Sequence, residues 1–105
     1  EVVLRDRTQL AQDGMLVIVA MIDGESGLLK GEAEVHSRGF VYLKESKDFI
    51  REINVLVKDI ISKTSSKDRT TNWAYVKENL RDKIGEFIFK RTERRPMILP
   101  FIVEI

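Results

Sequence analysis

Two apolar segments near opposite ends of the chain constrain its fold more than any other feature. Residues 15–22 read MLVIVAMI and residues 97–103 read MILPFIV, so neither segment carries polar side chains at alternate positions. A strand with one face in water normally alternates apolar and polar residues, whereas a strand covered on both faces is apolar throughout. The pattern therefore predicts two interior strands, and the closing one must pair with a strand far back in the sequence.

Pro100 complicates the placement of the closing segment, residues 94–105. Proline has no N–H to donate, so within sheets it is confined to edge strands and bulges. The sequence leaves two placements open: a bulge at Pro100, or an edge strand whose apolar outer side needs a cover such as a second subunit. In either case we expect this strand to lie beside residues 15–22 and under the helices.

A second strand is expected shortly after the first. Gly24 and Gly27 supply the positive φ angles that a tight reversal needs. Charged side chains then alternate with smaller or apolar ones over residues 28–34, which is typical of an edge strand with one face in water. We expect this strand to run antiparallel to the first and to be followed by a kink hinged at Gly39.

Two helices are predicted between the second strand and the closing one. Residues 46–63 and 72–90 show apolar side chains at helical spacing, with Ser46 and Thr71 as the expected N-caps. Gly85 costs about 1 kcal/mol relative to alanine inside a helix and therefore indicates close contact with a neighbouring element. The two apolar stripes consist of Phe49, Ile50, Ile53, Val57, Ile60 and Ile61, and of Trp73, Val76, Leu80, Ile84, Phe87 and Ile88.

The predicted order of strand, strand, helix, helix, strand defines an α+β fold. We expect a two-layer sandwich in which a three-stranded sheet packs against two α-helices. A chain of 105 residues with 43% hydrophobic content is large enough for one core and too small for two. We therefore predict a single domain at residues 15–105, preceded at residues 1–14 by the end of a linker. Because the chain starts at Glu1 without a methionine, we interpret it as a fragment of a longer protein.

The composition argues against several classes of function. The chain has no cysteine, which rules out a disulfide framework and a thiolate metal site, and it has no glycine-rich phosphate-binding motif. Its longest apolar run is eight residues, against the roughly 20 that a membrane-spanning helix needs. His36 is the only histidine, which favours a structural or surface role over metal binding. Glu78, Asp82 and Glu86 share one helical face among lysines and arginines, which is typical of an ion-paired surface.

A basic cluster at the end of the second predicted helix is the best candidate for a functional site. Residues 1–45 carry a net charge of −3 and residues 46–105 one of +4, and the cluster consists of Lys90, Arg91, Arg94 and Arg95. These cations suit a helix C-terminus and the flank of a hydrophobic strand for purely structural reasons. Alternatively, their forked donors contact RNA phosphates or a protein partner. The sequence leaves both interpretations open, although no aromatic residues are interleaved for base stacking.

Three strings in the sequence are similar to those of one known family. They are LRDR at residues 4–7 followed by Asp13-Gly14, SRGFVYLKES at residues 37–46, and RRPMILP at residues 94–100. Together they resemble the C-terminal domain of the ribonuclease J family, the metallo-β-lactamase/β-CASP ribonucleases. The resemblance covers essentially the whole chain.

This resemblance implies a parent protein with an activity that the chain itself lacks. The family consists of cytoplasmic 5′-to-3′ exonucleases and endonucleases of RNA decay and maturation, with two zinc ions in the catalytic core. The H-x-H-x-D-H string of that core is absent from this sequence. We therefore expect no catalytic, cofactor-binding or metal-binding residue here, and we expect the isolated chain to be inactive.

Two hypotheses about function follow from the resemblance. In the first, the domain is a non-catalytic accessory module that supports dimerisation or core stability and helps to position RNA near the active site. Its partners would be the parent catalytic core, a second copy and RNA, with no membrane involved. In the alternative, it is a protein–protein adaptor with no RNA contact.

Overall fold

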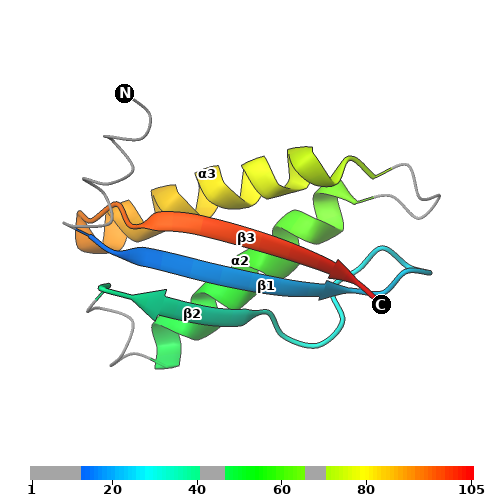
Figure 1. Ribbon diagram of the computed structural model, residues 1–105, viewed down its shortest axis with the longest axis horizontal. Helices are drawn as coiled ribbons and strands as arrows, with labels where there is room; N and C mark the ends of the chain where they lie inside the picture. Colours follow the sequence, from blue (N-terminus) through cyan, green and yellow to red (C-terminus); the bar gives the residue numbers. More distant parts are fainter. Residues whose placement is uncertain (1–12, 41–46, 66–70) are drawn as a thin grey trace.

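The computed structural model describes residues 13–40, 47–65 and 71–105, and it contains three strands and two helices in that part of the chain (Figure 1). Strand β1 is followed along the chain by β2, α2, α3 and β3. Their bounds are Met15–Ile22 for β1, Glu34–Arg38 for β2, Lys47–Thr64 for α2, Trp73–Thr92 for α3 and Met97–Glu104 for β3.

The strands form one mixed sheet in the order β2-β1-β3. β1 is the central strand and pairs antiparallel with β2 and parallel with β3, in a register that starts at Met15↔Met97. Both helices lie behind the sheet in Figure 1, so the molecule has two layers. The predicted α+β sandwich and its element order are therefore confirmed.

The core lies between the helices and the inner face of the sheet. Every second residue of β1 points inward and is buried, as the burial pattern of that strand shows. The two predicted helical stripes face this side, and Gly85 of α3 faces β3, where an added Cβ would lie 3.5 Å from Cδ1 of Ile98. The side chains buried in the core are Leu16, Ile18, Ala20, Ile22, Ala33, Phe40, Phe49, Ile53, Val57, Ile60, Ile61, Val76, Leu80, Ile84, Ile88 and Ile98.

β3 is an edge strand, and its backbone hydrogen bonds explain the position of Pro100. The N–H of Met97 donates to the carbonyl oxygen of Gly14, directly before β1, and the N–H of Ile105 donates to that of Ile22 at the end of β1, each over 2.9 Å. Backbone groups of successive residues point to opposite sides of a strand, so the odd-numbered residues of β3 bond to β1 and the even-numbered ones point to the free edge. Pro100 therefore lies where a missing N–H removes no hydrogen bond of the ladder. Of the two placements that the sequence left open, the edge strand is correct.

β1 is the central strand, as predicted, but the prediction that β3 is also an interior strand, and that both strands are covered on both faces, is wrong within the described part of the chain. β3 is an edge strand, and its burial pattern shows that the covered positions are every second residue at its start. Phe101 and Val103 remain 51% and 40% exposed. The helices cover only one face of a sheet, which leaves the outer face of these apolar strands without cover from any described helix or strand.

Two local predictions also need correction, namely the bounds of the second strand and the N-cap of the second predicted helix. The second strand spans Glu34–Arg38 rather than residues 28–34, because the segment after the reversal makes only an isolated bridge between Leu29 and Ile22. The expected kink therefore falls at the end of β2, where Gly39 has a φ of 72°. The N-cap of α3 is Asn72 and not Thr71, since the Asn72 side chain accepts a hydrogen bond from the N–H of Tyr75 over 3.2 Å. The predicted cap Ser46 and the lead-in at residues 1–12 lie outside the described residues.

Gly14 allows the chain to enter β1 close to the end of β2. It has a φ of 80°, and a Cβ added to it would lie 2.3 Å from the carbonyl oxygen of Arg38 and 2.4 Å from the carbonyl carbon of Gly39. No real Cβ approaches backbone atoms so closely. Only glycine fits this position, because it lacks both the Cβ and its restriction on φ.

We predict that Gly14→Ala lowers the free energy of unfolding by roughly 2–4 kcal/mol, from the positive φ and the overpacking combined. Gly31→Ala is the matched control, because Gly31 has a φ of 73° but a Cβ added to it would meet no atom within 4 Å. The control isolates the backbone strain and should lower the free energy of unfolding by about 1 kcal/mol. Urea unfolding measures both values, and equal losses would contradict the close approach at Gly14.

Candidate association surface and basic cluster

The basic cluster lies where α3 ends and the chain turns into β3. Glu93 adopts the left-handed conformation at the C-cap, with φ 59° and ψ 20°, and its N–H donates to the carbonyl oxygen of Phe89 over 2.8 Å. The N–H of Arg94 then donates to Oγ1 of Thr92 over 3.1 Å. This turn places Lys90 and Arg91 on the last turn of the helix, where cations interact favourably with the helix dipole.

The two helical cations of the cluster are held by acidic side chains. Nζ of Lys90 lies 3.0 Å from Oε1 of Glu86, one helical turn earlier. Nη2 of Arg91 lies 2.7 Å from Oε1 of Glu52 on α2, and its guanidinium lies 5.2 Å from the ring centroid of Phe87. Arg91 therefore joins the two helices and has a structural role.

The two arginines before β3 contact Asp13, which lies two residues before β1, and the end of α3. Nη1 of Arg94 lies 3.6 Å from Oδ1 of Asp13, and the backbone N–H of Arg95 donates to Oδ2 of the same carboxylate over 2.8 Å. The guanidinium of Arg95 stacks on the ring of Phe89 at 4.0 Å from its centroid. The structure thus brings all four predicted residues to one end of the molecule and gives each of them an intramolecular contact. RNA or partner contact by this cluster stays a prediction.

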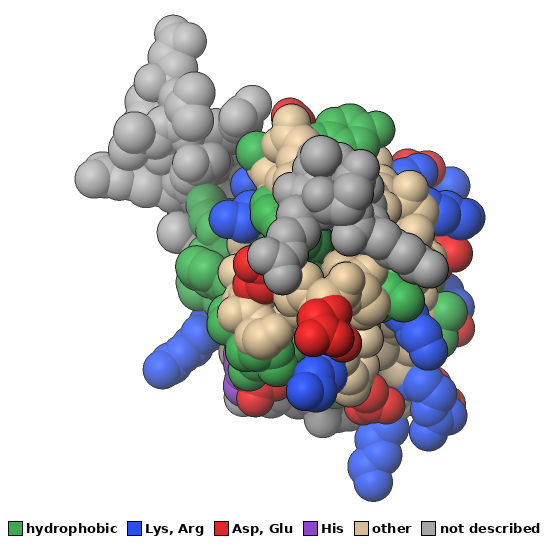
Figure 2. All heavy atoms as spheres, turned by 90° about the vertical axis from the view of Figure 1, so that its right-hand side faces the viewer, with side chains coloured by type: hydrophobic (Ala, Val, Ile, Leu, Met, Phe, Trp, Pro, Cys, Tyr) green, Lys and Arg blue, Asp and Glu red, His purple; other side chains and the backbone are tan. Residues whose placement is uncertain are grey.

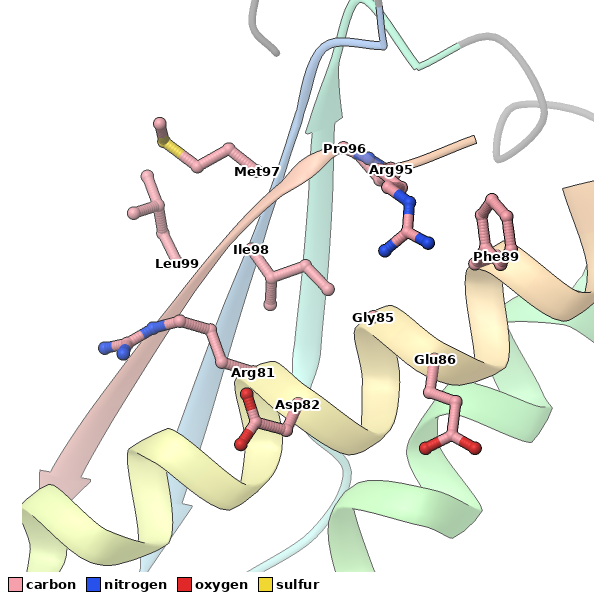
Figure 3. Close-up of a pocket in the computed structure, with 10 residues that line it drawn as sticks. All are labelled: Arg81, Asp82, Gly85, Glu86, Phe89, Arg95, Pro96, Met97, Ile98 and Leu99. Atoms are coloured by element: carbon pink, nitrogen blue, oxygen red, sulfur yellow. The ribbon is translucent and has the colours of Figure 1, made fainter. Parts of the chain in front are cut away.

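A groove of about 600 Å³ lies between α3 and the start of β3 (Figure 3). Figure 3 shows Ile98 pointing into the groove toward Gly85, whereas Met97 and Leu99 point away from α3. The guanidinium of Arg95 also points toward the groove. The close-up therefore shows that successive side chains of β3 point to opposite faces of the sheet.

The outer side of the sheet, which we call the open face, carries apolar side chains on two strands and polar ones on the third. Directly paired residues of neighbouring strands point to the same side, so the register defines this face. No helix or strand within residues 13–40, 47–65 and 71–105 covers it. The open face consists of Met15, Val17, Val19 and Met21 of β1, Met97, Leu99, Phe101 and Val103 of β3, and Glu34, His36 and Arg38 of β2.

The open face is turned toward the viewer in Figure 1, because the strands lie in front of the helices there. In Figure 2, which is turned by 90°, hydrophobic side chains gather along the left-hand side, where this face lies. Ile105 continues the pattern beyond β3 and is 59% exposed. All three methionines of the chain, Met15, Met21 and Met97, lie on the open face. Methionine is a flexible, adaptable side chain that is frequent at protein-binding surfaces.

The sequence predicted the open face only in part. The missing polar alternation of the two apolar strands was interpreted as cover on both faces, and a cover such as a second subunit was expected only if the closing strand lay at an edge. His36, for which a structural or surface role was predicted, lies exposed on β2. The described residues contain no cluster of three or more metal-ligating side chains, and neither described helix is long and apolar enough to cross a membrane.

Comparison with known proteins identifies the family. The model of the ribonuclease J C-terminal domain matches residues 2–105. The chain belongs to this family. It is 40% identical over 104 residues to ribonuclease J 2 of Staphylococcus aureus strain NCTC 8325, and 38% identical over 104 residues to ribonuclease J 2 of Staphylococcus epidermidis. These matches cover 99% of this chain but only 18% of each relative, so the chain spans less than one fifth of the length of these relatives.

The ion pair of Glu86 and Lys90 makes a testable contribution to the pH dependence of the folding stability. The hydrogen bond and the positive charge of Lys90 lower the pKa of Glu86 below its usual value. A carboxyl whose pKa is lower in the folded than in the unfolded chain stabilises the fold above the unfolded pKa, and this stabilisation is lost as the pH falls through the folded pKa.

We therefore predict that Glu86→Gln slightly lowers stability at pH 7 and that the difference from the unmodified chain vanishes in acid. Urea unfolding at several pH values measures the difference, with Glu78→Gln on the same helix as the control. A difference between Glu86→Gln and the unmodified chain that persists unchanged below the folded pKa would contradict this assignment.

Proposed function

We propose that this chain is a non-catalytic accessory domain of a ribonuclease J-like enzyme and that it acts through protein–protein contact at the open face, above all in dimerisation. The observation that carries the proposal is the open face itself, on which eight apolar side chains of β1 and β3 are left without cover from any described element. Monomeric proteins rarely expose contiguous apolar patches of this kind unless they bind something.

The free energy that burial of these side chains would contribute supports this proposal. Fully burying a Val, Leu, Phe or Met side chain contributes about 1.5–3 kcal/mol, and those of the open face are buried only in part. Covering them would therefore recover a substantial part of that free energy. Contact with another protein surface recovers it without any change in the fold.

RNA positioning is the alternative role for the basic cluster, and it has less support. Lys90 and Arg91 are paired with carboxylates, and Arg95 is stacked on an aromatic ring. A phosphate would have to compete with these contacts. The exo- and endonuclease activities and the zinc that the resemblance implies belong, in this proposal, to a cytoplasmic catalytic core outside this chain. The described residues do not offer a cluster of ligands that fits zinc.

The two roles differ in their effect on RNA binding. We predict that Arg94→Gln combined with Arg95→Gln changes the RNA affinity of the enzyme that carries this domain by less than about twofold. The control is Arg51→Gln, another exposed and ion-paired arginine. Affinity is measured over a range of salt concentrations. A marked loss of affinity with a salt slope reduced by about one unit per arginine would show phosphate contact instead.

The association role is tested at Phe101 and Val103, which are exposed on the open face. We predict that replacing both with threonine, which keeps the β-propensity, weakens the oligomer of the enzyme that carries this domain. Sedimentation velocity measures the oligomer, and Val55→Thr at a 64% exposed position of α2 is the control. An oligomer and an RNA-degrading activity that both match those of the control would contradict the proposed function.

A further inference from the structure

The free edge of β3 runs beside the groove that separates this strand from α3. β3 lies at the end of the sheet, so its even-numbered residues direct their backbone N–H and carbonyl groups away from β1. Ile98 lies where this edge meets the groove, and its side chain points into the groove toward Gly85 (Figure 3). An extended peptide can bind as an added strand to an exposed sheet edge of this kind, with its side chains in pockets beside the edge.

Pro100 limits the length of a strand that can be added here. It lies on the free edge and lacks an N–H, so a continuous ladder of hydrogen bonds to a long strand is interrupted at this residue. Before it, the N–H and the carbonyl group of Ile98 both point to the edge, and neither bonds to another described residue. The edge therefore suits a peptide of a few extended residues better than a second long strand.

Gly85 leaves open the space that a side chain of such a peptide needs. Glycine is unfavourable inside a helix, and the packing of α3 against β3 does not require it. Among the described residues, a Cβ added to Gly85 would meet only Cδ1 of Ile98 within 4 Å, and at 3.5 Å this is an ordinary van der Waals contact. Alanine would therefore fit. The missing side chain instead adds room to the groove of about 600 Å³ beside Ile98.

The charged side chains that line the groove favour an acidic peptide. Two of them are basic, Arg81 and Arg95, and two are acidic, Asp82 and Glu86. Glu86 is ion-paired with Lys90, however, with its Oε1 3.0 Å from Nζ. The remaining lining carries one more positive than negative charge, which is complementary to a carboxylate.

The guanidinium of Arg95 is held in an orientation that suits this carboxylate. It points toward the groove and stacks on the ring of Phe89, 4.0 Å from the ring centroid. Stacking engages the face of the guanidinium, whereas its N–H donors lie in the plane of the group and match the two oxygens of a carboxylate. Paired residues of neighbouring strands point to the same side of a sheet, so a peptide side chain beside Ile98 enters the groove between Gly85 and Arg95.

We propose that the groove between α3 and β3 binds a short acidic peptide of a partner protein, which is extended and joins the edge of β3 as a strand at Ile98. The peptide backbone exchanges hydrogen bonds with Ile98, and an aspartate or glutamate side chain of the peptide passes Gly85 and reaches the guanidinium of Arg95. This site uses the edge and the helix side of the sheet rather than the open face. The proposal therefore goes beyond the proposed function and does not depend on it.

A library of random heptapeptides displayed on phage and selected on the immobilised 105-residue chain tests this site. We expect the enriched peptides to contain aspartate or glutamate, and fluorescence anisotropy measures their affinity. Gly85→Leu, which fills the groove, should weaken binding of an enriched peptide by about tenfold or more. Gly85→Ala is the matched control and should change the affinity by less than about twofold, and circular dichroism verifies that both variants are folded.

A double-mutant cycle tests the contact with Arg95. Replacing the acidic residue of the peptide by its amide should weaken binding to the unmodified chain by roughly three- to fivefold, the range of an exposed ion pair. The same replacement should have no effect on binding to Arg95→Gln. Lys58→Gln, at an exposed position of α2, is the control and should retain the full effect of the replacement.

Several results would overturn this proposal. They are a selection that enriches no peptide, enriched peptides without acidic residues, and peptides that bind Gly85→Leu as tightly as Gly85→Ala. A short oligouridine that displaces the peptide and loses affinity in Gly85→Leu would show that the groove binds RNA instead. None of these results bears on the open face, whose role is decided separately by the Phe101 and Val103 variant.

Discussion

The parallel pairing of β1 with β3 is the interaction on which the rest of the structure depends. The two strands lie near opposite ends of the chain, and their pairing encloses β2 and both helices between them in sequence. Parallel strands need a long crossover, and here the two helices supply it and cover one face of the sheet. Both strands are apolar on both faces, but this arrangement covers only one. The open face is the direct consequence.

Much of the fold could be predicted from the sequence because periodicity reports burial. The apolar stripes of α2 and α3 and the apolar run of β1 were sufficient to place the core and the two layers. The boundaries of β2 could not be predicted, because the alternating charges of residues 28–34 resemble an edge strand as closely as Glu34–Arg38 does. Tertiary contacts decide which of these two segments forms the strand. One of them is the hydrogen bond from the Ala33 N–H to Oδ1 of Asn54 on α2. Likewise, the sequence could not distinguish Asn72 from its neighbour Thr71 as the N-cap of α3.

The candidate sites were harder to predict, because the sequence shows which side chains are present but not what each of them contacts. Arg91 and Arg95 stand out as cations in the sequence, yet their contacts with Glu52 on α2 and with the ring of Phe89 are visible only in three dimensions. Conversely, an apolar strand sequence indicates that both faces of the strand are covered, but it does not indicate which element or partner covers them. The pattern left open cover by the chain itself and, for an edge strand, cover by a second subunit; the proposed function assigns the cover to a protein partner.

Cover of the outer face of β1 and β3 by a partner can be observed directly at the three methionines. Because Met15, Met21 and Met97 all lie on the open face, ¹³C-methyl labelling of methionine gives NMR signals from that face alone. The measurement is the relaxation of these signals by a soluble gadolinium chelate, in the isolated chain at low and at high concentration. We expect all three methyl groups to be accessible when the chain is dilute and to become protected together as its concentration rises. Three methyl groups that stay equally accessible at every concentration would contradict association through this face.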